Sequence, residues 1–164
     1  MPMRKGLIFT AYFLVILLVF MAVPASFPQL SPQQLASLLV AYQQKPLLLM
    51  FVSAGSFFFD YLSWVMPQTE YREIQTLVHI RTPRFKPIVA SYWRLAWRYF
   101  LPFLALKGYV LILCANRVVW ISIVVWVVEW LAWTVVSLTR RQAIPSAVIF
   151  MSFLLTRFLL HGLF

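Results

Sequence analysis

The sequence predicts an all-α integral membrane protein. Hydrophobic residues make up 63% of its 164 residues and charged residues only 11%, whereas charged residues alone account for about 25% of a typical soluble domain. The apolar residues are concentrated in five long segments, and one polar, basic stretch separates the second segment from the third. A soluble chain of this composition would expose far too much apolar surface. The length is that of a single domain.

Five segments are expected to cross the bilayer, because each approaches the 20 or so mostly apolar residues that a spanning helix needs. They lie at 6–24, 47–66, 99–115, 118–138 and 143–162. The first follows Arg4 and Lys5 and ends near Val23-Pro24-Ala25, which resembles a signal-peptide cleavage site. We interpret it as a retained anchor helix whose N-terminus lies in the cytoplasm.

The basic residues predict how these spans are oriented. Six of the fourteen Lys and Arg residues lie in a predicted cytoplasmic segment at 67–98, and Arg140-Arg141 form a second inner turn, whereas the loop at 25–44 carries none. Because basic residues collect on the cytoplasmic side, the C-terminus at Phe164 is expected outside. The net charge of +10 is then matched by anionic lipid headgroups, and no nucleic-acid partner is expected.

Two helices that do not span the bilayer are also predicted. Ser31-Pro32 is typical of a helix start, with an N-cap serine and a proline in the first turn. The residues that follow predict an amphipathic helix at 32–43, lying on or dipping into the outer leaflet. A second amphipathic helix is predicted on the inner side from about Glu70 to the stop at Pro83. Its apolar face consists of Tyr71, Ile74, Leu77 and Val78, and its polar face includes Arg72 and Glu73.

Four ionisable residues fall within the predicted spans: Asp60, Lys107, Glu129 and Arg157. Each costs about 2.5 to 3.5 kcal/mol near the bilayer centre, so each is expected to have a partner or water. Lys107 and Glu129 lie at similar depths on two helices joined by a tight turn, which predicts an ion pair that Asp60 could join. This pair either fixes the register of the hairpin or belongs to a polar path. Arg157 is expected to extend outward to the headgroups.

Small and aromatic side chains predict close contacts between the spans. Gly55 and its neighbours in the second span, and Gly108 in the third, are expected to let helices approach closely. Trp126, Trp130 and Trp133 recur at helical spacing, which favours a packed or lipid-facing surface over a site that stacks a ligand.

No residue pattern indicates catalysis. The sequence contains no HExxH, GxSxG or CxxC motif and no phosphate-binding GxxxxGK[ST] loop. The two histidines, His79 and His161, belong to opposite sides of the predicted membrane, and Cys114 is the single cysteine. We therefore expect no enzyme activity, no cofactor and no metal site, and any ATP hydrolysis would belong to another chain.

The inner segment reads Glu70-Tyr71-Arg72-Glu73-Ile74-Gln75-Thr76-Leu77, followed by Arg81-Thr82-Pro83-Arg84-Phe85. It resembles the first cytoplasmic loop of type-two ABC export permeases, and the order of predicted elements is also similar. In that family this loop forms a short coupling helix that docks on the ATP-hydrolysing subunit. The family usually has six spans and a glycine where Gln75 stands, so a reduced or accessory version of the fold is also consistent with the sequence.

The resemblance implies a function and partners. The chain would be a permease-type subunit of an export complex in a bacterial plasma membrane, bound to an ABC ATPase and to a second membrane subunit, identical or different. The alternative is a small accessory or immunity-type membrane protein that binds a partner in the bilayer and transports nothing. The residues implied in docking the ATPase are Glu70, Tyr71, Arg72, Glu73, Ile74, Leu77, Val78, Arg81, Arg84 and Phe85.

Overall fold

The computed structural model describes residues 2–41, 47–81, 85–114, 116–139 and 145–161, and all the regular secondary structure in these ranges is helical. The predicted all-α class is confirmed. The helices are α1 (Pro2–Ser26), α2 (Pro32–Val40), α3 (Leu47–Arg81), α4 (Phe85–Leu113), α5 (Arg117–Thr139) and α6 (Ser146–His161).

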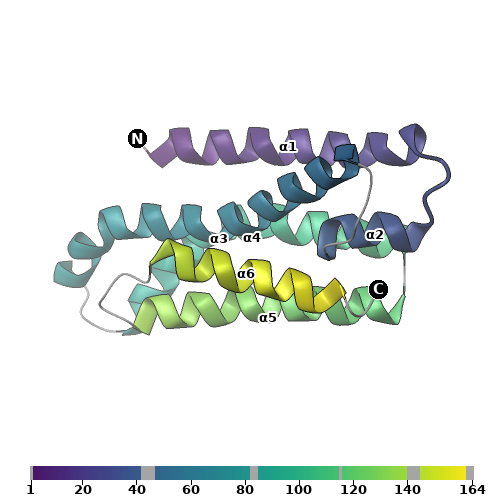
Figure 1. Ribbon diagram of the computed structural model, residues 1–164. Helices are drawn as coiled ribbons and strands as arrows, with labels where there is room; N and C mark the ends of the chain where they lie inside the picture. Colours follow the sequence, from purple (N-terminus) through teal and green to yellow (C-terminus); the bar gives the residue numbers. More distant parts are fainter. Residues whose placement is uncertain (1, 42–46, 82–84, 115, 140–144, 162–164) are drawn as a thin grey trace.

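The five longer helices lie side by side, and the short helix α2 lies at one end of the bundle (Figure 1). Helices α1, α4 and α6 begin, and α3 and α5 end, at the opposite end. We call this opposite end the basic end, because Lys5 and Arg72 lie near it, and the other the α2 end. The alternation of helix directions is the one that the distribution of basic residues predicts.

Among the described residues, four helical segments are long and apolar enough to cross a membrane: Lys5–Ser26, Leu47–Ile74, Ile88–Leu113 and Arg117–Leu138. They correspond to the first four predicted spans, although the second and third extend further toward the basic end than the sequence predicts. The fifth predicted span forms α6, which has only 16 residues. At 1.5 Å per residue α6 is about 24 Å long, shorter than a typical hydrocarbon core of about 30 Å.

The segment predicted as a separate cytoplasmic unit at 67–98 belongs instead to two continuous helices. Helix α3 runs for 35 residues through Pro67, and α4 already begins at Phe85. Contacts between the two helices hold this region together: Gln68 Nε2 donates to Tyr92 Oη at 2.9 Å, and Tyr99 Oη donates to Glu70 Oε1 at 2.6 Å. These hydrogen bonds join side chains 24 and 29 residues apart in the sequence, which local helix signals do not report.

Helix α1 packs against α3 and α4 through aromatic contacts and one close backbone approach. The Phe9 ring lies 5.1 Å from the Phe59 ring and 4.9 Å from the Tyr99 ring, measured between centroids. Tyr12 Oη donates to the Gly55 carbonyl at 2.8 Å, and a Cβ at Gly55 would come within 3.1 Å of an α1 side chain. The predicted close approach is confirmed at Gly55 but not at Gly108, where an added Cβ would meet nothing within 4 Å.

Helix α2 begins as predicted, but it is not a surface helix. Ser31 Oγ accepts from the Gln34 N–H, and the Gln34 side chain accepts from the Ser31 N–H. This reciprocal arrangement is a capping box. From Leu35 to Val40 every residue is buried, and α2 contacts α3, α4, α5 and α6. The face predicted to meet lipid meets other helices, because the sequence pattern of one helix does not reveal which neighbours surround it.

The N-cap of α2 provides a first test of this fold. Because Ser31 satisfies a backbone N–H that α2 cannot satisfy itself, Ser31→Ala should lower the free energy of unfolding by about 1 kcal/mol. Ser31→Asp should retain most of the wild-type free energy of unfolding, since Asp is an equally good N-cap. Unfolding titrations in detergent measure both variants. Equal losses for Ala and Asp would mean that the cap does not contribute through this hydrogen bond.

Candidate functional site

Three of the four charged residues predicted within the spans gather at the C-terminal end of α2. Asp60 on α3, Lys107 on α4 and Arg157 on α6 are all buried there. The fourth, Glu129 on α5, is half-buried and belongs to a different contact. There Ser152 Oγ of α6 donates to Glu129 Oε1 at 2.5 Å and accepts from Trp133 Nε1 at 3.2 Å.

The last carbonyls of α2 explain why these side chains converge. The Ala41 N–H donates to the Ser37 carbonyl at 2.9 Å, which closes the last helical turn. The next three carbonyls lie beyond that bond, as at any helix end. Each accepts from a side chain of a different helix: Leu38 from Arg157 Nη2 at 3.2 Å, Leu39 from Lys107 Nζ at 3.0 Å, and Val40 from Trp126 Nε1 at 3.2 Å.

This arrangement, which we call the α2 cap, is favourable for two physical reasons. A buried carbonyl without a hydrogen bond is costly in an apolar interior, where no water replaces the missing donor. A helix C-terminus also carries a partial negative charge, which cations stabilise. Lys107 and Arg157 meet both requirements at once. The buried Trp126 supplies an uncharged donor, and its ring lies 4.9 Å from Lys107 Nζ, a distance typical of cation–π contacts.

Lys107 pairs with Asp60, which corrects the predicted Lys107–Glu129 pair. Lys107 Nζ lies 2.8 Å from Asp60 Oδ2, and both side chains are at most 1% exposed. The depth argument compared α4 with α5, its neighbour along the chain. Helix α4 packs much more extensively against α3, so the carboxylate on α3 is the one within reach. Asp60 is therefore the ion-pair partner of Lys107, the role predicted for Glu129.

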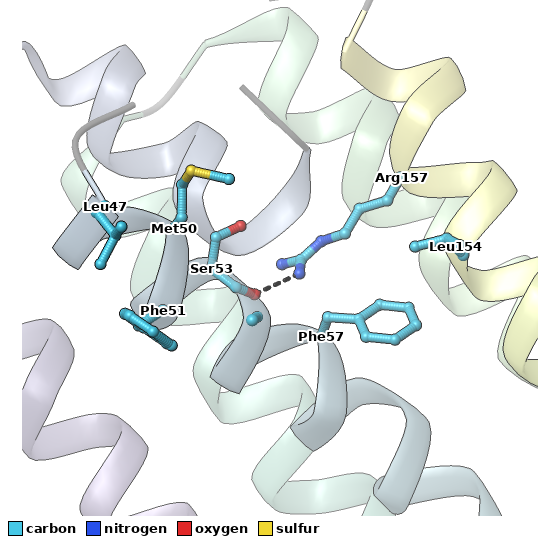
Figure 2. A pocket seen from close by; sticks show the side chains of 8 residues that line it. Leu47, Met50, Phe51, Ser53, Phe57, Leu154 and Arg157 are labelled. Carbon is cyan, nitrogen blue, oxygen red and sulfur yellow. Dashed lines mark hydrogen bonds between the residues drawn. The ribbon is translucent and has the colours of Figure 1, made fainter. Parts of the chain in front are cut away.

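Arg157 points into the bundle instead of outward to the headgroups. It is only 2% exposed. Its guanidinium donates to the Ser53 carbonyl at 2.5 Å (Figure 2). It also donates to Ser56 Oγ at 2.9 Å and to the Leu38 carbonyl. Ser56 in turn donates to the Leu39 carbonyl at 3.4 Å. Internal oxygens of α2 and α3 thus replace the headgroups that the prediction assigned to Arg157.

One sequence signal could have indicated this inward orientation. Ile149, Phe153, Arg157 and Leu160 recur at helical spacing and form the buried face of α6. The remainder of α6 is equally apolar, so the spacing alone did not distinguish the buried face from a lipid-facing one. Arg157 marks the buried face only when it is assumed to need internal partners.

The predicted docking residues divide into two groups. Arg72, Glu73 and Ile74 are exposed, and Glu73 forms an ion pair with Lys5. Glu70 and Tyr71 are buried, with Glu70 bonded to Tyr99 of α4. Arg84 and the side chains of Leu77, Val78, Arg81 and Phe85 lie outside the described part of the structure.

A surface hollow of about 280 Å³ lies beside the exposed group, between α3 and α4. Ile74 contributes to it from α3, and Arg94, Leu95 and Arg98 contribute from α4 together with Ser91. In the sequence, Arg94 and Arg98 count only among the six basic residues at 67–98. No local pattern brings them together with Ile74, because 70–81 is predicted as separate from the third span.

No group of three or more His, Cys, Asp or Glu side chains that could hold a metal occurs among the described residues. The chain matches no protein-family model, no curated protein and no solved structure.

The Lys107–Asp60 pair can be tested by breaking it from one side. Lys107→Met should lower the free energy of unfolding by about 3 to 5 kcal/mol, since it leaves the Asp60 carboxylate buried without its cation. Lys107→Met combined with Asp60→Leu should recover more than half of this loss, because the buried carboxylate is then removed together with its cation. Unfolding titrations in detergent provide the measurement.

Glu129→Gln is the matched control, because it removes the partner that depth alone predicted. It should cost less than about 1 kcal/mol, because the amide oxygen of Gln can accept the same hydrogen bond from Ser152 at this half-buried position. A loss as large as that of Lys107→Met would show that Glu129, and not Asp60, neutralises the lysine.

Proposed function

We propose that the chain is a permease-type membrane subunit of an ABC export complex, which couples to a separate ATPase at its basic end. The docking surface would combine the exposed part of the 70–85 segment with Arg94 and Arg98 on α4. The observation that carries the proposal is the hollow between α3 and α4, because it lies beside the residues of the motif that resembles a coupling helix.

The chemistry of this hollow suits an acidic protein partner. Ile74 is exposed, as are Arg94 and Arg98, so an apolar side chain and two guanidinium groups border the same hollow. Arginine binds carboxylates with two parallel hydrogen bonds, which gives direction as well as affinity. A partner with a projecting apolar side chain flanked by Asp or Glu would complement this surface.

The hydrogen bonds of this region support transmission of movement from the hollow into the bundle. Gln68 and Glu70 tie α3 to α4 directly beside the hollow, and Glu73 ties α3 to α1. Further along α3, Asp60 binds Lys107 at the α2 cap. A partner that moves the end of α3 would therefore move α3 and α4 as one body.

A second candidate function is a small accessory or immunity-type protein that binds a partner in the bilayer and transports nothing. The observation that favours it is the filled interior of the bundle. Trp126, Trp130 and Phe103 are fully buried, and the Trp130 ring lies 4.5 Å from the Phe100 ring. A transport path would then have to form between this chain and a second membrane subunit, not within the chain.

The location proposed is a bacterial plasma membrane with the basic end in the cytoplasm and the α2 end outside. The collection of Lys and Arg at the basic end supports this orientation. The orientation also places the hollow on the side where an ATPase would find ATP.

Co-purification of the ATPase in mild detergent tests the proposal. Arg94→Glu and Arg98→Glu should each reduce the amount of nucleotide-binding subunit retained by at least about tenfold, because each replaces a favourable charge contact with a repulsive one. Arg117→Glu is the matched control: it reverses one exposed arginine at the α2 end and should leave retention unchanged.

The wild-type chain decides between the two candidate functions. Retention of an ATPase supports the export subunit. Retention of another membrane protein without any ATPase favours the accessory protein, and loss of ATPase that is equal in Arg94→Glu and Arg117→Glu would place docking outside the hollow.

A further inference from the structure

A cavity of about 390 Å³ opens beside the α2 cap, between the first turns of α3 and the last turns of α6. Its walls are almost entirely apolar, and Arg157 is the one charged residue among those that line it (Figure 2). The lining residues are Leu47, Met50, Phe51, Ser53, Ala54, Phe57, Leu154 and Arg157.

The cavity is accessible from the lipid-facing surface of the bundle. Leu47 is 72% and Phe51 70% exposed, and Ala54 is also exposed. These residues belong to a segment long and apolar enough to span the membrane. The surroundings of the cavity opening are therefore lipid acyl chains, and a molecule that enters from this side needs an apolar portion.

Arg157 forms no ion pair among the described residues, where the ion pairs are Lys107–Asp60 and Lys5–Glu73. Asp60 is bonded to Lys107 and attracts Arg157 only at longer range. Arg157 donates hydrogen bonds only to neutral oxygens of Ser53, Ser56 and Leu38, and its Nε donates to no acceptor among the described residues. Two buried cations thus share one carboxylate. Because the excess positive charge is costly in an apolar interior, the cavity is electrostatically complementary to an anion.

The depth of the cavity indicates which part of a lipid would lie there. Ser53 is six residues from the start of α3, and Arg157 is four residues from the end of α6. At 1.5 Å per residue these positions are about 6 to 9 Å from the helix ends. Both positions lie in the half of a hydrocarbon core about 30 Å thick that adjoins the headgroups at the α2 end.

We propose that this cavity binds one phospholipid with an anionic headgroup at the α2 end of the bundle. The lipid phosphate would accept hydrogen bonds from the Arg157 guanidinium, a pairing for which arginine is well suited. One acyl chain would lie along Phe51, Ala54 and Leu154 on the apolar wall. The lipid would supply a second negative charge beside Asp60, which faces both Lys107 and Arg157, and it would stabilise α2 through Arg157. This site does not depend on an ATPase partner at the basic end.

Native mass spectrometry of the purified chain with added lipid tests the proposal. The probes are phosphatidylglycerol, whose net charge is negative, and phosphatidylcholine with the same acyl chains, whose net charge is zero. The wild-type chain should retain phosphatidylglycerol at least about tenfold more strongly. Arg157→Gln should abolish this preference, whereas Arg117→Gln, which removes an exposed arginine, should preserve it.

A second variant keeps the test decisive if Arg157→Gln fails to fold. Ala54→Phe fills the cavity without altering any hydrogen bond of Arg157, and it should reduce phosphatidylglycerol retention by about tenfold. Ala132→Phe adds the same ring at an exposed position of α5 and should have no effect. Thermal unfolding gives an independent readout, because a ligand that binds only the folded chain raises its midpoint.

Three outcomes would overturn the proposal. Equal retention of the two lipids would show that the cavity takes an acyl chain without regard to charge. Unchanged phosphatidylglycerol retention in Ala54→Phe would place the lipid elsewhere. A second copy of the chain crosslinked at the cavity in place of lipid would identify the occupant as protein.

Discussion

The fold depends on satisfying the backbone carbonyls at the end of a short helix buried among apolar helices. Helix α2 has nine residues and no continuation within the described part of the structure whose N–H groups could donate to its last carbonyls. Arg157, Lys107 and Trp126 supply the missing donors from α6, α4 and α5. Because each of these helices contributes one donor, α2 fixes their relative positions, and they in turn keep α2 folded where water cannot.

Using these side chains to satisfy the carbonyls of α2 has a cost of its own, because two of the three donors are cations buried without water. Lys107 is neutralised by Asp60 on α3, which ties α3 into the same cluster. Arg157 is stabilised by the Ser53 carbonyl, Ser56 and the negative end of α2, and at longer range by Asp60, which it shares with Lys107. The positive charge at the α2 end is therefore only partly balanced within the described chain, and Arg157 lines the cavity between α3 and α6. Arg157 therefore combines two features: its positive charge is not fully balanced, and it lines a cavity that opens to the surface of the bundle.

Local features of the sequence were predicted well, and contacts between distant residues were not. The apolar segments of α1, α3, α4 and α5 and the Ser31 cap depend on neighbouring residues, so the sequence reveals them. Helix α5 is apolar on all sides, and no periodicity shows that Trp126 and Trp130 face inward while Val124 and Val128 face out. The inward turn of Arg157 and the partner of Lys107 likewise depend on helices distant in sequence. Pro67 was read as a boundary, although α3 continues through it, because contacts with α4 stabilise both helices there.

The position of Asp60 midway along α3 limits how the two ends of the bundle can influence each other. A movement imposed near Ile74 either carries α3 and α4 together or separates Asp60 from Lys107. Separation would expose a broken buried pair, at about 3 to 5 kcal/mol, whereas coupling between distant sites in proteins typically amounts to about 1 to 3 kcal/mol. The joint movement therefore requires less free energy. It would shift α3 and α4 against α6. The boundary between α3 and α6 contains Ser53, Arg157 and the cavity that they line. A partner at the basic end and a lipid at the α2 end would thus act on the same boundary, and by linkage each would change the affinity for the other by the same factor.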